Sequence, residues 1–373
     1  MTPVAATDHL MIIFGAGASH DAIPAQVVDE YSSAQWGSPN YARFRWFQPP
    51  LARDLFKSQP EFDEAIGLYG PAGALIRDRL RPWVQQGRDL EILLDTISRE
   101  APRSRTVRRE LIALRLYLRR TLWRCSEEWA KAAPAQSNYH VVLQKAVRWQ
   151  ERTRAAKISL VTFNYDLLLD KAVSAHPGIL LDSLEAYVAS DEFRVFKPHG
   201  SVNWARIIDE PVPSGDPISS LINRAGDDPH GSPARGAFCI VPTWDSYVYS
   251  PRGAGPNGLA FPLITVPIRS KDNFEFPSDH EDKLKQAVLD VTRVLVVGWR
   301  ATEQNFLALW NGRRTARPLV HVVSNTMAGA TLTQKNLVKA GVGAQGRLRL
   351  FEGGFTSYVG SSALDELIPR KSR

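Results

Sequence analysis

Short runs of apolar and β-branched residues recur along this chain and alternate with segments of helical periodicity. Several runs are almost continuously apolar, as expected of strands that are buried on both faces of a parallel sheet. Helical patterns at 165–174 and 302–310 fall between them. This alternation predicts an α/β fold, Rossmann-like, with a mostly parallel sheet between helices. The expected strands cover residues 10–14, 158–163, 194–196, 239–241, 263–268, 294–297, 319–323 and 348–351.

The middle of the chain has a different pattern. From residue 106 to 133, apolar side chains recur at steps of three and four, which predicts one apolar face of a long helix. Residues 61–80, 89–97 and 139–152 also have helical periodicity. We therefore expect a Rossmann-like domain formed by residues 1–50 and 155–373, with a helical subdomain inserted at 51–154. The apolar positions of the long helix are Val107, Leu111, Leu114, Leu118, Leu122, Cys125 and Trp129.

Composition narrows the class of protein. With 44% hydrophobic and 23% charged residues, the chain can bury a core and is not of the disordered class. Two cysteines, Cys125 and Cys239, provide neither a disulfide framework nor a four-cysteine zinc site. No apolar run is long enough to span a bilayer, and the start lacks the basic region of a signal peptide. We expect a cytoplasmic protein that does not associate with membranes.

A segment rich in glycine, proline and aspartate, residues 209–236, predicts a surface loop. Loops of this length inside a domain are often lids, and the alternative is a loop without a function.

Basic residues gather on and just before the long helix, although the net charge of +7 by itself identifies no partner. We expect most of them to be solvated, because the apolar face of the helix is accounted for separately. The alternatives are a docking surface for a partner subunit and a contact with nucleic acid. Few aromatic residues interleave with them, which disfavours binding of single-stranded nucleic acid by base stacking. The cluster comprises Arg103, Arg105, Arg108, Arg109, Arg115, Arg119, Arg120 and Arg124.

Three motifs follow directly after predicted strands, where ligands bind in open α/β sheets. The turn Gly15-Ala16-Gly17-Ala18-Ser19 would let the backbone approach a pyrophosphate, or it is simply a tight strand–helix turn. In the second motif, residues 162–166 (TFNYD), Asp166 could instead cap a helix. In the third, residues 197–201 (KPHGS), His199 is a candidate general base or a structural hydrogen-bonding residue.

Taken together and in this order, the motifs resemble the sirtuin family and its bacterial sirtuin-like relatives. The segments 295–300 and 322–325 extend the resemblance, which covers about residues 8–35 and 155–355. It implies that NAD binds at the sheet edge as a substrate, with no metal required. Asn164 and Asp166 would position the nicotinamide ribose and the attacking water, and His199 would be the general base. Ala16, Gly17 and Ser19 would hold the phosphates, while Gly15, Ala18, Thr162, Gly298, Trp299 and Asn325 would complete the cofactor site.

The sequence also departs from the deacylating sirtuins. It has no C-x-x-C pair for their zinc module, and Phe163 stands where the family has glutamine. Residues 20–24 (HDAIP) lack the family's phenylalanine–arginine pair. These departures favour hydrolysis of NAD to ADP-ribose and nicotinamide over deacylation or ADP-ribosyl transfer. The combination resembles bacterial proteins that degrade NAD during phage defence.

That resemblance implies control by assembly, as a homo-oligomer or with a HerA-like ATPase. A different class of function, a catalytically silent subunit that binds NAD or ADP-ribose as a scaffold, is the alternative.

Overall fold

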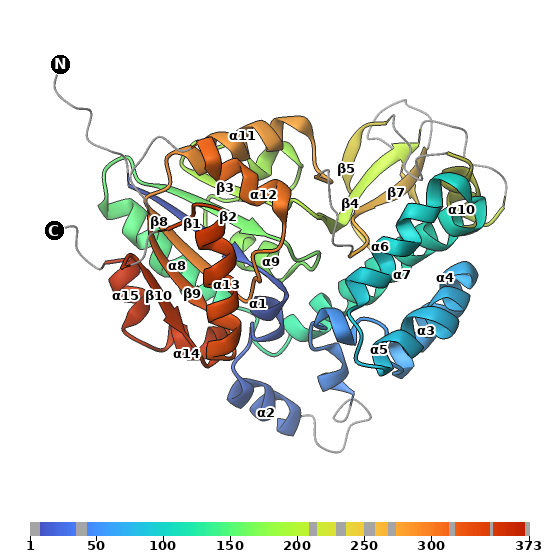
Figure 1. Cartoon of the computed structure of the whole chain (residues 1–373), viewed down its shortest axis with the longest axis horizontal. Coiled ribbons are helices and arrows are strands. Elements are labelled where there is room, and N and C mark those ends of the chain that lie inside the picture. The colour runs from blue at the N-terminus through green and yellow to red at the C-terminus, as the bar shows by residue number, and fades with distance from the viewer. Residues whose placement is uncertain are drawn as a thin grey trace.

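The fold is of the α/β class, as the sequence predicts, with a six-stranded parallel sheet in the order β10-β9-β8-β1-β2-β3 (Figure 1). The computed structural model describes residues 8–34, 43–208, 215–228, 236–249, 258–267, 274–312, 318–343 and 346–369. The strands are β1 (His9–Phe14), β2 (Lys157–Thr162), β3 (Phe193–Phe196), β8 (Arg293–Val297), β9 (Leu319–Val323) and β10 (Leu348–Phe351).

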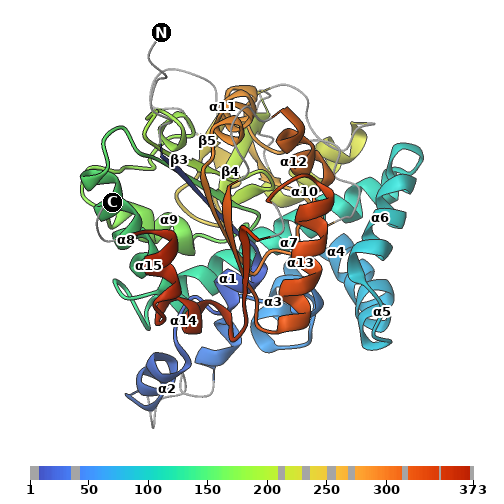
Figure 2. The same cartoon turned by 60° about the vertical axis from the view of Figure 1, so that its left-hand side comes forward.

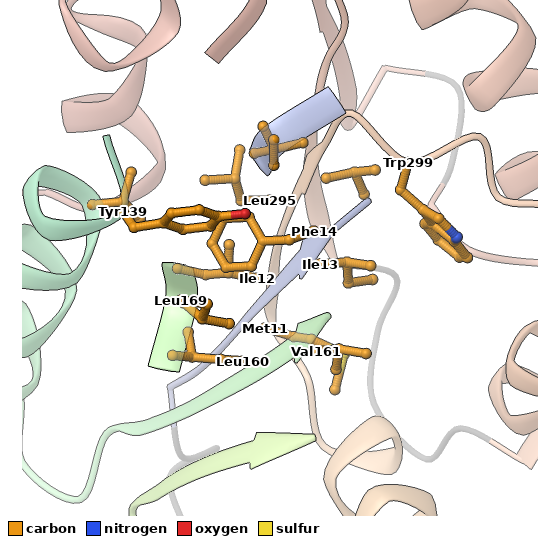
Figure 3. Close-up of a cluster of buried hydrophobic side chains, with 14 of the residues drawn as sticks. Met11, Ile12, Ile13, Phe14, Tyr139, Leu160, Val161, Leu169, Leu295 and Trp299 are labelled. Atoms are coloured by element: carbon orange, nitrogen blue, oxygen red, sulfur yellow. The ribbon is translucent and has the colours of Figure 1, made fainter. Parts of the chain in front are cut away.

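Helices cover both faces of this sheet (Figure 2). All six residues of β1 are buried, which explains why the central strands read as continuous apolar runs. In Figure 3, Tyr139 and Leu169 lie on one side of β1 and Trp299 lies on the other. One face carries α8 (Asn138–Arg152), α9 (Leu168–Ser174), α14 (Gly354–Val359) and α15 (Ala363–Leu367). The other face carries α11 (Ser278–Leu289), α12 (Gln304–Ala308) and α13 (Met327–Lys339).

A second hydrophobic core lies beside the first and is formed by helices together with a four-stranded antiparallel sheet, β5-β4-β7-β6. The long helix α7 belongs to both cores, because Trp129 packs in the first and Leu118 in the second. The strands are β4 (Gly200–Ile208), β5 (Phe238–Ile240), β6 (Val248–Tyr249) and β7 (Gly258–Ile264). The helices are α3 (Pro60–Leu68), α4 (Gly70–Leu75), α5 (Arg81–Gln85), α6 (Leu90–Glu100), α7 (Arg105–Ala130) and α10 (Pro217–Asp227).

The remaining helical elements are short or peripheral. Two of them, α1 (Ala16–His20) and α2 (Ala25–Ala34), follow β1. The others are single turns at Phe44–Phe47, Ala52–Asp54, Ile76–Leu80, Ala101–Arg103, Glu185–Tyr187 and Leu309–Gly312.

Several expectations about these elements are wrong. The sequence does not predict the antiparallel sheet. The strand expected at 263–268 is β7 of that sheet, which ends at Ile264. Residue 268 lies outside the described residues. The segment 209–236 contains α10, while 209–214 and 229–235 lie outside the described residues. Asp216 accepts hydrogen bonds from the first turn of α10 and Pro217 occupies its first position, a helix-start signal that the surrounding glycines and prolines obscured.

The expectation that most of the arginines are solvated is also wrong. Arg119 is 0% exposed and Arg120 is 6% exposed, and of the eight only Arg103 and Arg105 are exposed. Arg119 donates to the carbonyls of Thr243 and Ser246, beside the antiparallel sheet. The arginines are enclosed because α7 packs against α3, α4, α10 and the antiparallel sheet, so its polar side is covered as well.

The division into a domain of residues 1–50 and 155–373 and an insertion at 51–154 stays a prediction. Helix α8, inside the predicted insertion, packs with the first core.

Candidate active site

The register of the parallel sheet brings the candidate motifs to one edge. Phe14 at the end of β1 pairs with Thr162 of β2 and Val297 of β8, and Val297 pairs with Val323 of β9. The residues that follow these positions therefore share the carboxyl edge. Because β2 and β3 lie to one side of β1 and β8 to β10 to the other, the strand order reverses between β1 and β8. Ligands of open α/β sheets bind at such a switch point.

Glycines line the switch point because the turn after β1 and the turn after β8 touch there. Gly15 donates its amide to Val297 O (3.0 Å), and Gly17 donates to Gly298 O (3.2 Å). A Cβ on Gly17 would lie 2.9 Å from the Cα of Gly298, and one on Gly298, whose φ is +60°, would lie 2.5 Å from Ala18 N. Mutual packing therefore requires these glycines, whether or not a pyrophosphate approaches them.

Within the first turn, the predicted phosphate-binding residues differ in access. Ala16 is exposed and Gly17 is half-buried, whereas Ala18 and Ser19 are buried. The amide of Ala18 already donates to Gly15 O (2.8 Å). The accessible part of the predicted phosphate loop is thus Ala16 and Gly17.

Asn164 ties the second motif to the first turn. Its Nδ2 donates to Gly15 O (2.9 Å) and to the Oγ of Ser19 (2.8 Å), and it lies 3.4 Å from the hydroxyl of Tyr139. These acceptors fix the orientation of the carboxamide. In the part of the chain that the structure describes, no donor reaches its Oδ1. The residue is 7% exposed, and this oxygen keeps its acceptor capacity unused.

Asp166 lies behind Asn164. Its carboxylate accepts from the Leu168 amide (3.0 Å), as a helix cap does. Burial raises the pKa of the Asp166 carboxyl, and the nearby Ser19 hydroxyl, the Lys197 ammonium and the Leu168 amide oppose that effect. The arrangement suits a residue that holds the turn before α9 in place.

His199 lies at the junction of the two sheets, between β3 and β4. Its Nδ1 lies 3.2 Å from the carbonyl oxygen of Phe163, and since a carbonyl only accepts, Nδ1 carries the proton in the neutral ring. The basic Nε2 lone pair is then the one that can accept a proton. Gly200 follows with φ +79°, and a Cβ there would lie 1.9 Å from Leu263 O, so the chain path requires glycine directly after His199.

Three other predicted cofactor residues have visible structural roles. Thr162 is 1% exposed and accepts from the Asn164 amide (3.1 Å). Trp299 is 4% exposed and stacks on Phe163, with ring centroids 4.9 Å apart. Asn325 alone is exposed, and its carbonyl accepts from Gly353. Of these three, Asn325 is the one that a ligand can reach without displacing a side chain.

Sequence reasoning missed several residues of this edge. Tyr139, from the first turn of α8, shares a 2.9 Å hydrogen bond with Ser19, and burial raises its pKa well above the usual value, so it stays a neutral phenol. Lys197 is 0% exposed and donates to Asp166 O (2.8 Å) and to Asp170 (2.7 Å). Its position two residues before His199 was the only signal that could have identified it.

Asp21 was also missed, and it binds the other end of the first turn to α14. Its carboxylate accepts from the amide (3.0 Å) and the hydroxyl (2.7 Å) of Thr356. Asn138 donates to Asp21 O and to Thr356 as well. The first turns of α8 and α14 therefore both hold the segment that begins at Gly15.

Neither a membrane span nor a metal cluster is found among the described residues. No described helix is both long and apolar enough to cross a bilayer. Within the same residues, no three histidine, cysteine or acidic side chains are grouped as metal ligands. Cys125 and Cys239 are both buried and unpaired as disulfides.

No protein-family model matches the chain, and no curated protein matches it. Solved structures of Sir2 homologues are similar in architecture. A Sir2 homologue in complex with NAD is 13% identical over 96% of this chain and 88% of that chain, with a TM-score of 0.39. A Sir2 homologue mutant with ADP-ribose is 12% identical over 97% and 91% of the two chains, with a TM-score of 0.37. Likeness at this level assigns no activity, so the chemistry must come from the site itself.

Proposed function

We propose that the protein hydrolyses NAD at the bond between nicotinamide and ribose. The observation that carries the proposal is the Asn164 carboxamide. Its Nδ2 is fixed by Gly15 and Ser19, and its Oδ1 is left as an oriented acceptor at the switch point of the sheet. An oriented acceptor in a water-poor site can hold the hydroxyl of a nucleophilic water or of a ribose.

The chemistry needs little beyond positioning. As the C–N bond to nicotinamide breaks, positive charge develops on the ribose, and water adds at the anomeric carbon. Asn164 Oδ1 would orient that water, and His199 Nε2 would accept its proton. The products are ADP-ribose, neutral nicotinamide and one proton. Asp166 caps the turn that follows Asn164 and is a positioning residue in this scheme.

The rest of the cofactor site is proposed from the sequence resemblance. Ala16, Gly17 and Ser19 would hold the phosphates, with Gly15 and Ala18 forming the turn. Asn325 would lie near the adenine ribose. Thr162, Gly298 and Trp299 would shape the site rather than contact NAD, because each is occupied by packing or hydrogen bonds to protein.

The biological setting is proposed on the resemblance alone. We place the activity in bacterial antiviral defence in the cytoplasm, where depletion of NAD stops the infected cell. Such an enzyme requires restraint, so a homo-oligomer or a complex with a HerA-like ATPase would control it. A catalytically silent scaffold that binds NAD or ADP-ribose is the alternative function.

Release of nicotinamide from NAD tests the proposal, with the pure protein alone and together with the product of the neighbouring gene. We expect Asn164→Ala and His199→Ala each to lower the rate by at least about a hundredfold with little change in melting temperature. His176→Ala, two residues beyond the end of α9, is the matched control and should keep the wild-type rate. Wild-type turnover in either site variant refutes the assigned role, and binding without any release under either condition favours the scaffold.

A further inference from the structure

A buried phenol lies beside the Asn164 carboxamide. Tyr139, from the first turn of α8, is 0% exposed. Its hydroxyl lies 2.9 Å from Ser19 Oγ and 3.4 Å from Asn164 Nδ2. Ser19 Oγ in turn accepts from Asn164 Nδ2 at 2.8 Å. Side chains from α1, from α8 and from the turn after β2 therefore meet in one buried polar cluster.

The chemistry of these groups sets the directions of their hydrogen bonds. Gly15 O is a carbonyl oxygen and only accepts, so it takes one of the two Nδ2 protons of Asn164. The other Nδ2 proton goes to Ser19 Oγ, so the serine must turn its own proton away from Asn164. The Tyr139 hydroxyl can accept that proton or donate to the remaining lone pair of Ser19 Oγ. In either case it holds the serine hydroxyl in the orientation that accepts from Nδ2.

Packing and the start of α8 fix the position of the phenol. The Tyr139 ring makes edge contacts with Phe14 and Phe355, with ring centroids 5.0 Å and 5.6 Å apart. Asn138, the residue before it, donates its amide to Ala22 O at 2.7 Å. Burial raises the pKa of Tyr139 well above its usual value, so the group stays a neutral hydroxyl.

We propose that Tyr139 is a positioning residue, which acts through Ser19 to hold the Asn164 carboxamide with Oδ1 directed at the reacting water. The inference rests on the proposed hydrolysis of NAD and adds to it a residue from outside the three motifs. Because Tyr139 is fully buried, it contacts the carboxamide and its partners rather than the substrate. Its hydroxyl should therefore affect the chemical step and leave the binding of NAD unchanged.

The variant Tyr139→Phe removes the hydroxyl and keeps the ring. We expect kcat for nicotinamide release to fall about tenfold, as loss of one hydrogen bond predicts, with KM for NAD within about twofold of the wild type. Tyr117→Phe is the matched control. Tyr117 is also 0% exposed, but in the second core, where its hydroxyl donates to Leu55 O at 2.9 Å. This control should keep the wild-type kcat.

Coupling to Asn164 separates positioning from a general loss of stability. In the Asn164→Ala background, Tyr139→Phe should cause no further fall in kcat, because the carboxamide on which it acts is gone. Three results would each overturn the proposal: an equal fall in both backgrounds, an unchanged kcat in Tyr139→Phe, or the same fall in Tyr117→Phe.

A readout that does not depend on turnover distinguishes this inference from the proposed function. In protein that carries isotopically labelled asparagine, the nuclear magnetic resonance signal of the Asn164 side-chain amide is the one lost in Asn164→Ala. We expect this signal to shift in Tyr139→Phe and to stay in place in Tyr117→Phe, and an unchanged signal in Tyr139→Phe would refute the positioning role. If the signal shifts as expected but the wild type releases no nicotinamide, the hydrolysis of NAD is refuted while the control of the carboxamide by Tyr139 is supported.

Discussion

The ion pair between Lys197 and Asp170 gives the sharpest test of how the candidate site is held. Both side chains are buried, at 0% and 9% exposure, with the Nζ 2.7 Å from the Oδ2. Tyr187 donates to the other carboxylate oxygen, and Lys197 also donates to Asp166 O at 2.8 Å. One ammonium therefore supports both a buried carboxylate and the turn that carries Asn164.

Replacing Lys197 with methionine keeps most of the side-chain volume and removes the charge. Asp170 is then a buried carboxylate whose one remaining hydrogen-bond partner among the described residues is the Tyr187 hydroxyl. Breaking such a pair costs about 3–5 kcal/mol, whereas replacing both partners by apolar residues is often nearly neutral. We expect Lys197→Met to lower the free energy of unfolding by that amount, and Lys197→Met with Asp170→Leu to regain most of it.

Urea denaturation of the two variants measures these costs. The control is Lys131→Met, which breaks a surface pair whose side chains are 55% and 27% exposed and should cost less than about 1 kcal/mol. In the double variant, Asp166 O still lacks its donor, so the rate of nicotinamide release should stay low although stability returns. The reasoning fails if Lys197→Met costs no more than the control, or if the double variant recovers both stability and full turnover.

Two further predictions concern the sheet and its edge. Burial lowers the pKa of His9 and of His321 to about 4, below the value of 6.5 in the unfolded chain. The contribution of each histidine to the free energy of unfolding should therefore be complete at neutral pH and fall by about 3 kcal/mol between pH 6.5 and 4. His321→Phe should flatten the pH dependence of the urea midpoint, and an unchanged slope would contradict this. Gly298→Ala should lower the free energy of unfolding by about 2 kcal/mol or more, because the added Cβ meets backbone at 2.5 Å. The control Gly341→Ala, with φ +77° and open space around it, carries only the backbone strain. Equal melting temperatures of the two variants would show that the turn after β1 and the turn after β8 can separate.

The parallel sheet could be predicted because its strands are buried on both faces and so lose the polar alternation of exposed strands. The antiparallel sheet could not be predicted in the same way. Its central strand β4 begins directly after His199, within a motif that already suggested a site, and β6 has only two residues. Helix α10 begins with a clear cap, yet the glycines and prolines around it give the whole segment the composition of a loop.

The clustering of the three motifs could be predicted, because parallel strands that begin at one edge also end at one edge. The hydrogen bonds that join these motifs to one another and to α8 could not be predicted. Tyr139 and Ser19 are 120 residues apart, and no local pattern links a tyrosine in a helix start to a serine after the first strand. For the glycines, the pattern predicted their positions, while the structure adds a second reason for them: Gly15 and Gly17 pack directly on Gly298.

The helical segment 51–154 contributes to the candidate site more than its position in the sequence suggests. From α8 it supplies the Tyr139 hydroxyl, and from α7 it supplies Ser126, whose Oγ accepts from the Leu167 amide at 3.0 Å. Leu167 follows Asp166 directly, so α7 and α8 both hold the turn that positions Asn164. Arg108 of α7 donates to Gly226 O of α10, and the buried Arg119 donates to Thr243 O beside the antiparallel sheet, so α7 links that turn to the second core.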